Sequence, residues 1–280
     1  MSVPAAGAPV PASPVCLTPR TLAEACVLRA AYPQAQPIAG ATAAQLAWPD
    51  TRAPGVLLDL QALVREAAPR PTTRLDGAIV LSAFATIESL RMDAALREAL
   101  PALAGLLAAV GSAPVRRLGT LGGNLCWSSG DLVPAMLALG VRYRFAIGGE
   151  RPACAPRQMP RGDLLVEVVL PEVTRWVILE KVAFRASFSP TLITVAMVAD
   201  RHGPRLAVGG GPTEPQRLIQ TEALLAGGAT AGALREAVAA EMRAGDDALA
   251  SAAERVAVAA RVIAGHAPAL VAPPSAGAAR

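Results

Sequence analysis

The residues whose types and spacing could do chemistry are concentrated at 116–124, which reads Arg-Arg-Leu-Gly-Thr-Leu-Gly-Gly-Asn. Glycine lets successive backbone N–H groups point at one anion, and it lets a phosphate approach the chain closely. Thr120 and Asn124 could add side-chain donors, and Arg116 could add positive charge. The stretch therefore predicts an anion-binding loop, although an ordinary glycine-rich turn has the same composition.

Other patterns of catalysis and cofactor binding are missing from the sequence. There is no G-x-G-x-x-G between a strand and a helix, and no G-x-x-x-x-G-K-[ST]. The two histidines, His202 and His266, are isolated and supply no Ser/His/Asp or Cys/His set. The four cysteines form no C-x-x-C pair, so their spacing fits neither zinc nor an iron–sulfur cluster. We expect no catalytic residue and no metal site in this chain.

The composition indicates a globular protein rather than a nucleic-acid binder, and its mild basicity suits an anionic small ligand and an ordinary solvated surface equally. Hydrophobic residues make up 53% of the 280 residues and aromatic residues 3%, so Ala, Val and Leu must build the core. The 26 Lys and Arg against 22 Asp and Glu give a charge of +4 without any long basic block. No signal-peptide pattern opens the chain, and no apolar run approaches the roughly 18–20 residues of a membrane span. We expect a soluble, cytoplasmic protein that binds no nucleic acid.

The N-terminal part predicts an arm and a small α/β unit. Residues 1–16 are rich in Pro, Ala and Val and indicate a flexible arm. Within 17–62, Thr21 and Glu24 form a capping box, which predicts a helix that ends before Pro33. Two apolar runs in the same segment predict short strands, at 36–39 and 56–60.

Two further units follow along the chain. Segment 63–170 predicts strands at 78–81, 141–145 and 164–170, helices at 86–91, 93–110 and 132–139, and a turn-rich stretch at 111–131. Segment 171–268 predicts strands at 176–181, 192–198 and 205–208, then three Ala-rich helices at 217–226, 230–243 and 249–264. Strands followed by helices indicate an α+β domain. We expect a disordered tail at 269–280.

The stretch at 115–126, Val-Arg-Arg-Leu-Gly-Thr-Leu-Gly-Gly-Asn-Leu-Cys, closely resembles a known motif. It is similar to the second flavin-binding motif in the medium, FAD-carrying subunit of the molybdenum hydroxylases. That family includes carbon monoxide dehydrogenase and xanthine dehydrogenase. The segments 21–25, 37–42, 170–172 and 181–185 resemble further stretches of the same subunit in the same order. The resemblance covers about 17 to 264.

The resemblance implies a two-subdomain FAD-binding module (PCMH-like, 17–62 and 63–170), followed by a C-terminal α+β domain with a small sheet and helices. It implies that two backbone loops hold the FAD pyrophosphate. These are loop 1, which consists of Ala39, Gly40, Ala41 and Thr42, and loop 2, which consists of Gly119, Thr120, Leu121, Gly122, Gly123 and Asn124.

Three single residues are also implied as cofactor contacts. Asp131 would bind the sugar or linker part of FAD, Leu170 would offer backbone contacts to the adenosine end, and Lys181 would lie near the flavin ring. A cation beside the ring favours reduced flavin. Residue types alone leave two alternatives open, since Asp131 could be a helix N-cap and Lys181 a surface lysine on a strand.

The implied function is electron transfer. The organic substrate would be oxidised at a molybdenum–pterin large subunit, and electrons would pass through a [2Fe–2S] small subunit to FAD in this chain. Reduced FAD would then pass them to an acceptor such as NAD or oxygen. This chain lacks the cluster cysteines, so the resemblance places both metal cofactors on partner chains.

Loop 1 departs from the family pattern, which reads Ala-Gly-Gly-Thr followed by a polar residue, because positions 41 and 43 here are both alanine. If position 41 needs a positive φ, alanine costs roughly 1 kcal/mol or more. A lost phosphate donor would cost roughly 1.5–3 kcal/mol, which is up to about a hundredfold in affinity. Two alternatives therefore stay open. The chain could be a degenerate scaffold subunit that binds FAD weakly or not at all, or a stand-alone oxidoreductase of the vanillyl-alcohol-oxidase type.

Overall fold

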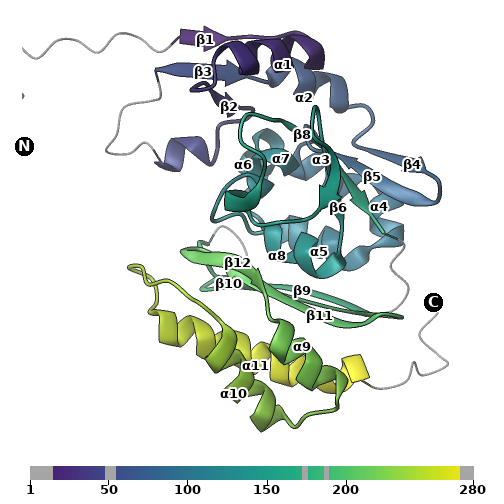
Figure 1. Cartoon of the computed structure of the whole chain (residues 1–280), viewed down its shortest axis with the longest axis vertical. Coiled ribbons are helices and arrows are strands. Elements are labelled where there is room, and N and C mark those ends of the chain that lie inside the picture. The colour runs from purple at the N-terminus through teal and green to yellow at the C-terminus, as the bar shows by residue number, and fades with distance from the viewer. Residues whose placement is uncertain (1–14, 48–54, 172–175, 186–188, 272–280) are drawn as a thin grey trace, which may run out of the picture.

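The computed structural model describes residues 15–47, 55–171, 176–185 and 189–271. Three sheets follow one another along the chain and divide these residues into a first, a second and a C-terminal lobe (Figure 1). The second lobe lies between the other two in the figure. Helices and strands alternate in the first lobe, six successive helices separate β5 from β6 in the second, and the C-terminal lobe has strands first and helices after, as expected for an α+β protein.

The first lobe is a small parallel sheet with the strand order β1-β3-β2. Thr21 caps the first helix, because its Oγ1 accepts the Glu24 N–H at 3.2 Å. The Glu24 carboxylate accepts from the Arg20 N–H at 2.8 Å, so the predicted capping box forms one residue early. The elements are β1 (Val15–Leu17), α1 (Leu22–Ala31), β2 (Gln36–Ile38), η1 (Ala44–Ala47), β3 (Val56–Asp59) and α2 (Gln61–Ala67).

The second lobe is a five-stranded antiparallel sheet with the order β4-β5-β8-β6-β7, covered by short helices. Its strands are β4 (Thr72–Leu75), β5 (Ala78–Ser82), β6 (Arg142–Phe145), β7 (Gly149–Pro152) and β8 (Leu165–Leu170). Its helices are α3 (Ile87–Met92), α4 (Ala94–Ala99), α5 (Pro101–Ala109), α6 (Ala113–Leu118), α7 (Leu121–Leu125), α8 (Val133–Leu139) and the 3₁₀ turn η2 (Pro156–Gln158).

The C-terminal lobe is a four-stranded antiparallel sheet with the order β12-β11-β10-β9. Its strands are β9 (Trp176–Ala183), β10 (Thr191–Asp200), β11 (Gly203–Gly210) and β12 (Thr213–Arg217), and its helices are α9 (Ile219–Ala226), α10 (Ala231–Glu241) and α11 (Ala252–Val271). One face of the sheet packs on these three helices, and the other faces the second lobe (Figure 1).

A shared apolar core joins the C-terminal lobe to the second lobe. Ala196, Val198 and Ala207 of the C-terminal sheet are buried in the same cluster as the core residues of the second lobe. The neighbouring side chains Val195 and Met197 belong to the separate core under the helices, because side chains alternate between the two faces of a strand. The relative position of these two lobes is therefore set by hydrophobic packing.

Several expectations differ from the structure. Val15 and Cys16, which we placed in the arm 1–16, are part of β1, where they pair with β3. The first residues of the tail 269–280 continue α11 as far as Val271, and the rest of the tail and 1–14 lie outside the described residues. The stretch 111–131 contains helices α6 and α7, because Ser112 and Thr120 each cap a helix there.

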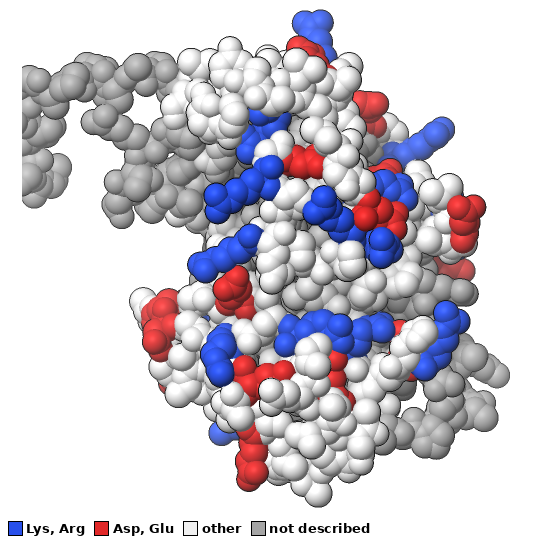
Figure 2. Space-filling view, viewed as in Figure 1, with Lys and Arg blue, Asp and Glu red and all other residues white. Residues whose placement is uncertain are grey.

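The described residues contain no helix that is long and apolar enough to cross a membrane. Basic and acidic side chains are interspersed over the face shown in Figure 2, without a continuous patch of one sign. All four cysteines are free thiols.

Candidate functional site

Loop 1 leaves β2 with backbone donors that are free to bind a ligand. The Ala39 carbonyl accepts from Gln61 Nε2 at 2.7 Å, which fixes the start of the loop. Ala41 has a φ of +54°, in the left-handed region that alanine rarely adopts. Among the described residues, the N–H groups of Gly40, Ala41 and Thr42 have no hydrogen-bond partner. Successive free N–H groups around a left-handed residue form an anion-binding nest.

Loop 1 packs directly against loop 2. A Cβ atom on Gly40 would lie 1.9 Å from the Leu118 carbonyl oxygen, so only glycine fits at this contact. A Cβ atom on Gly119 would lie 3.1 Å from Thr42 Oγ1. The structure therefore brings together the two loops that the sequence predicted as one cofactor cradle, although they are nearly 80 positions apart in the sequence.

Loop 2 is the first turn of α7 rather than an open loop. Thr120 is its N-cap, and Thr120 Oγ1 accepts from the Gly123 N–H at 3.1 Å. Most other N–H groups of loop 2 are also bonded within the chain: Gly119 to Val115 O, Leu121 to Ala85 O, Gly122 to Ala83 O and Asn124 to Thr120 O. Within the described part of the chain, the Thr120 N–H is the donor of this loop without a partner. Loop 2 thus offers a close-packed surface and one backbone donor.

Asn124, the last residue of loop 2, holds the two ends of the segment 124–132 together. Its Oδ1 accepts from the Leu132 N–H at 3.0 Å, at a buried position. Gly130 packs against the same residue, since a Cβ atom there would lie 2.0 Å from the Asn124 carbonyl oxygen. The predicted role of Asn124 as a side-chain donor remains open to its Nδ2, while its Oδ1 holds segment 124–132 in shape.

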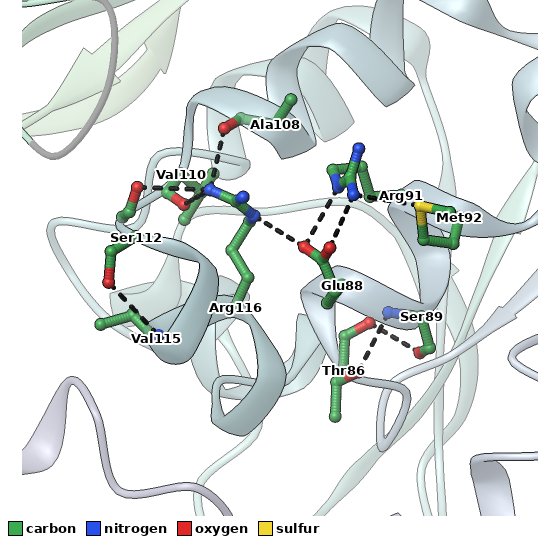
Figure 3. A network of polar contacts seen from close by, with 11 residues as sticks. Thr86, Glu88, Ser89, Arg91, Met92, Ala108, Val110, Ser112, Val115 and Arg116 are labelled. Carbon is green, nitrogen blue, oxygen red and sulfur yellow. Dashed lines mark hydrogen bonds and ion pairs between the residues drawn. The ribbon is translucent and has the colours of Figure 1, made fainter.

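Arg116 does not direct its charge at loop 2, which corrects the sequence interpretation. Its guanidinium donates to Glu88 Oε2 at 2.8 Å and to the carbonyls of Ala108 and Val110, at 3.0 and 3.2 Å (Figure 3). Arg91 binds the same carboxylate. Together Arg91 and Arg116 lower the pKa of Glu88 from 4.5 to about 2. The network ties α6, and so the start of loop 2, to α3 and to the end of α5.

Asp131 and Lys181 meet at the seam between the second and the C-terminal lobes. Lys181 Nζ lies 3.0 Å from Asp131 Oδ2 and donates to the Ala109 carbonyl at 3.1 Å. The Thr191 hydroxyl donates to the other Asp131 oxygen. The two charged side chains are only 5% and 13% exposed. Lys181 is also the only lysine of the sequence.

These contacts rule out both alternatives that residue types had left open. Asp131 is not a helix N-cap, because Leu132 holds that position in α8 and has no side-chain capping bond. Lys181 is not a surface lysine, because the second lobe covers it. Both residues pair with each other, and their predicted contacts with FAD stay predictions.

Leu170 lies away from the two loops. The Gly122 N–H donates to Ala83 O and the Ala83 N–H donates to Val166 O, so loop 2 meets β8 near Val166. Leu170 is four residues further along the same strand, about 13 Å away at about 3.3 Å per residue. Its predicted contact with the adenosine end of FAD is therefore separate from the pyrophosphate cradle.

A small hollow opens beside this seam. Ser128 and Ser129 line one side of it, and Gly211 and Pro212 of the β11–β12 turn line the other, around a volume of about 100 Å³. Pockets that enclose small-molecule ligands usually measure about 300–1,000 Å³. Over the part of the chain that the structure describes, no group of three His, Cys, Asp or Glu residues could hold a metal ion.

Sequence reasoning missed two residues that shape the site. Gln61 anchors loop 1 from α2, and Thr191 holds Asp131 from β10. Neither residue belongs to a motif. Only the fold places them beside their partners, at separations of 22 and 60 residues.

A family model described as the FAD binding domain in molybdopterin dehydrogenase matches residues 11–172, more than half of the chain. The chain belongs to this family. The match covers both loops and Asp131, and the resemblance stated from the sequence is confirmed. Membership of this family makes the protein an FAD-binding oxidoreductase subunit of the molybdenum hydroxylase type. None of the curated proteins matches the sequence at a significant level.

Solved structures of this family share the fold over nearly the whole chain. One is a chain of quinoline 2-oxidoreductase from Pseudomonas putida 86, with a TM-score of 0.76 and 22% identity, covering 93% of this chain and 99% of that one. Another belongs to the carbon monoxide dehydrogenase of Hydrogenophaga pseudoflava, with a TM-score of 0.81 and 18% identity, covering 93% and 98%. A third belongs to the carbon monoxide dehydrogenase of Oligotropha carboxidovorans, with a TM-score of 0.76 and 20% identity, covering 91% of this chain and 96% of that one. The predicted PCMH-like α+β fold is confirmed.

The residues of this subunit fit the phosphate part of FAD. A diphosphate needs several donors at one place, and loop 1 offers three successive free N–H groups beside that of Thr120. The glycines let the two loop backbones approach closely, with the Thr42 hydroxyl beside Gly119. Lys181, which the resemblance places near the flavin ring, is paired with Asp131 in this structure.

Proposed function

We propose that this chain binds FAD and acts as the electron-transfer flavin subunit of a molybdenum hydroxylase. The observation that carries the proposal is the nest of loop 1, which is closed against loop 2. Ala41 has the left-handed conformation that a nest requires, and the neighbouring N–H groups have no protein partner among the described residues. Buried or half-buried N–H groups are rarely left unpaired without a ligand or water to accept them.

The proposed partners are a [2Fe–2S] small subunit, which would deliver electrons, and a molybdenum–pterin large subunit, which would oxidise the organic substrate. Bound FAD would supply the redox chemistry, and the residues of this chain would bind and orient it. NAD or oxygen is the proposed acceptor, and the complex is proposed to be cytoplasmic. We also propose that the domain limits are 17–62, 63–170 and 171–268.

The proposal is tested by titrating the purified full-length chain with FAD and following flavin absorbance and fluorescence. The matched variants are Gly40→Ala, whose Cβ would collide with Leu118, and Gly55→Ala, whose Cβ would meet nothing within 4 Å. We expect the wild type and Gly55→Ala to bind FAD alike. Gly40→Ala should lose at least about tenfold in affinity, since the two loops must separate.

A contrary result would be a wild-type chain that stays colourless with added FAD, both alone and when co-purified with its partner subunits. The second candidate function, a scaffold subunit without flavin, would then hold. The pairing of Lys181 with Asp131 favours that candidate, because it leaves the lysine without a free charge for the flavin. Co-purifying iron and molybdenum would still mark the chain as part of the complex, whereas their absence with FAD bound would indicate a stand-alone oxidoreductase.

A further inference from the structure

A continuous series of buried polar contacts runs from the C-terminal helices to the segment that carries loop 2. It begins at Arg255 of α11, whose side chain is fully buried. The Arg255 guanidinium pairs with Asp247 and donates to the carbonyls of Leu192 and, at 3.4 Å, Thr191. The register of β10 shifts between Thr191 and Ile193, so Arg255 supports an irregular point of the strand.

The series continues across the seam between the lobes. The Thr191 hydroxyl donates to Asp131, and Lys181 binds the second oxygen of the same carboxylate. Asp131 directly precedes Leu132, whose N–H is held by Asn124 of loop 2. The steps Thr191–Asp131 and Asp131–Lys181 join side chains, whereas Arg255 reaches Thr191 through its backbone carbonyl and Asn124 reaches Leu132 through its backbone N–H.

We propose that Thr191 and Arg255 are positioning residues for the cofactor site. Through Asp131 and Lys181 they hold segment 124–132, and with it loop 2, in the arrangement that binds FAD. The series of contacts Arg255–Thr191–Asp131–Lys181 is called the seam tie below. Its effect on FAD binding rests on the proposed function, whereas its effect on the seam does not.

The physical reason is the cost of leaving a buried charge without partners. If the lobes separate at this seam, Asp131 loses both Thr191 and Lys181, and the Lys181 ammonium loses its carboxylate. A buried charge that loses its partner costs far more than the net value of the pair. The closed seam is therefore favoured by polar contacts in addition to the apolar core.

The single lysine of the chain gives a direct probe of the seam. An amine-reactive reagent can modify only Lys181 and the terminal amine, and peptide mass spectrometry separates the two. In the closed protein Lys181 is 5% exposed and should react slowly. Its reaction rate in the FAD-free protein therefore reports how often the seam opens.

Three variants isolate the Thr191 hydroxyl. Thr191→Val removes it with little change of shape, and Thr191→Ser restores it. The matched control is Thr221→Val, since the fully buried Thr221 hydroxyl donates to Glu241 at 2.9 Å in the same lobe but away from the seam. We expect Lys181 to react about tenfold faster in Thr191→Val only, which corresponds to about 1.4 kcal/mol for one lost hydrogen bond. Thr191→Ser and Thr221→Val should react as the wild type does.

The second readout is the dissociation constant for FAD in the same four proteins. We expect Thr191→Val to bind several-fold more weakly, and Thr221→Val to bind as the wild type does at a comparable loss of thermal stability. Equal Lys181 reaction rates in Thr191→Val and wild type would overturn the seam tie. Faster reaction with unchanged FAD affinity would overturn its positioning role. If the wild type binds no FAD, the proposed function fails, and the Lys181 rates alone decide whether the seam tie exists.

Discussion

At the scale of single residues, loop 1 carries two separate changes. The sequence raised two causes of weaker FAD binding, which are backbone strain at Ala41 and the loss of the polar contact after Thr42. Ala41 has the left-handed conformation in the structure, with a φ of +54°. We expect this strain to be present with and without FAD, so that it lowers the stability of the fold and leaves the affinity nearly unchanged.

Ala41→Gly should accordingly stabilise the protein. Glycine removes roughly 1–2 kcal/mol of left-handed strain, and it adds about 0.4–1 kcal/mol of unfolded-state entropy cost. We expect a net gain of about 0.5–1 kcal/mol in the free energy of unfolding, measured by urea denaturation, with an FAD affinity within about twofold of the wild type. The control is Ala43→Gly, at a position with an ordinary φ, which should only lose stability. A large gain in FAD affinity for Ala41→Gly would show that the loop rearranges on binding.

At the scale of elements, periodicity and capping predicted most helices and strands. The strands that were missed are marked by other features, such as a hairpin turn. β4 was not predicted, although Asp76-Gly77 forms the two-residue turn to β5 with both φ angles positive. Asp-Gly is a strong hairpin signal, so this strand could have been found. β12 pairs only with β11 and contains Pro215, which is tolerated because the strand lies at the edge of the sheet.

The parts of the site that lie in sequence motifs could be predicted, whereas the contacts that only the fold creates could not. The two loops are an example of the first kind, and the pair of Asp131 and Lys181 is an example of the second. Glycines mark both loops, because close backbone approach demands them. Nothing local marks Asp131 and Lys181 as partners, since they are 50 residues apart and meet only when the C-terminal sheet packs on the second lobe.

The network of α3, α5 and α6 makes a prediction about pH. Glu88 has a folded-state pKa of about 2, below its ordinary 4.5, so its ion pairs stabilise the fold above pH of about 4.5. That contribution is lost as the pH falls from about 4.5 toward about 2. Glu88→Gln should therefore cost about 2 kcal/mol at neutral pH, because charge-assisted hydrogen bonds are lost, and progressively less in acid.

Urea unfolding of both proteins between pH 7 and pH 3 measures this difference. Glu98→Gln is the control, since Glu98 is exposed on α4 and has no ion pair among the described residues. A difference between Glu88→Gln and the wild type that stays constant through pH 3 would contradict the assigned role of Arg91 and Arg116.

At the scale of the whole molecule, the three lobes differ in the amount of apolar core that holds them in place. The second and C-terminal lobes share one large apolar core and the seam contacts. The first lobe has a much smaller core, to which the second lobe contributes Leu164; its members are Ala25, Ala35, Leu58, Leu60, Leu63 and Leu164. Local stability follows buried apolar contact. We therefore expect the first lobe to open at a lower free energy than the other two, which unfold together.

The lower stability of the first lobe predicts which part of the molecule FAD stabilises most. FAD that bridges loop 1 and loop 2 joins the least stable lobe to the most stable part of the molecule, so openings of the first lobe must release the ligand. At an FAD concentration of about 100 Kd, such openings should cost up to about 2.7 kcal/mol more. Native-state hydrogen exchange should then slow in β1, β2 and β3, while amides of α10 and α11 that exchange by local fraying stay unchanged. Slowing confined to the C-terminal lobe would mean that FAD binds at the seam without loop 1, and the nest around Ala41 would then not be the diphosphate site.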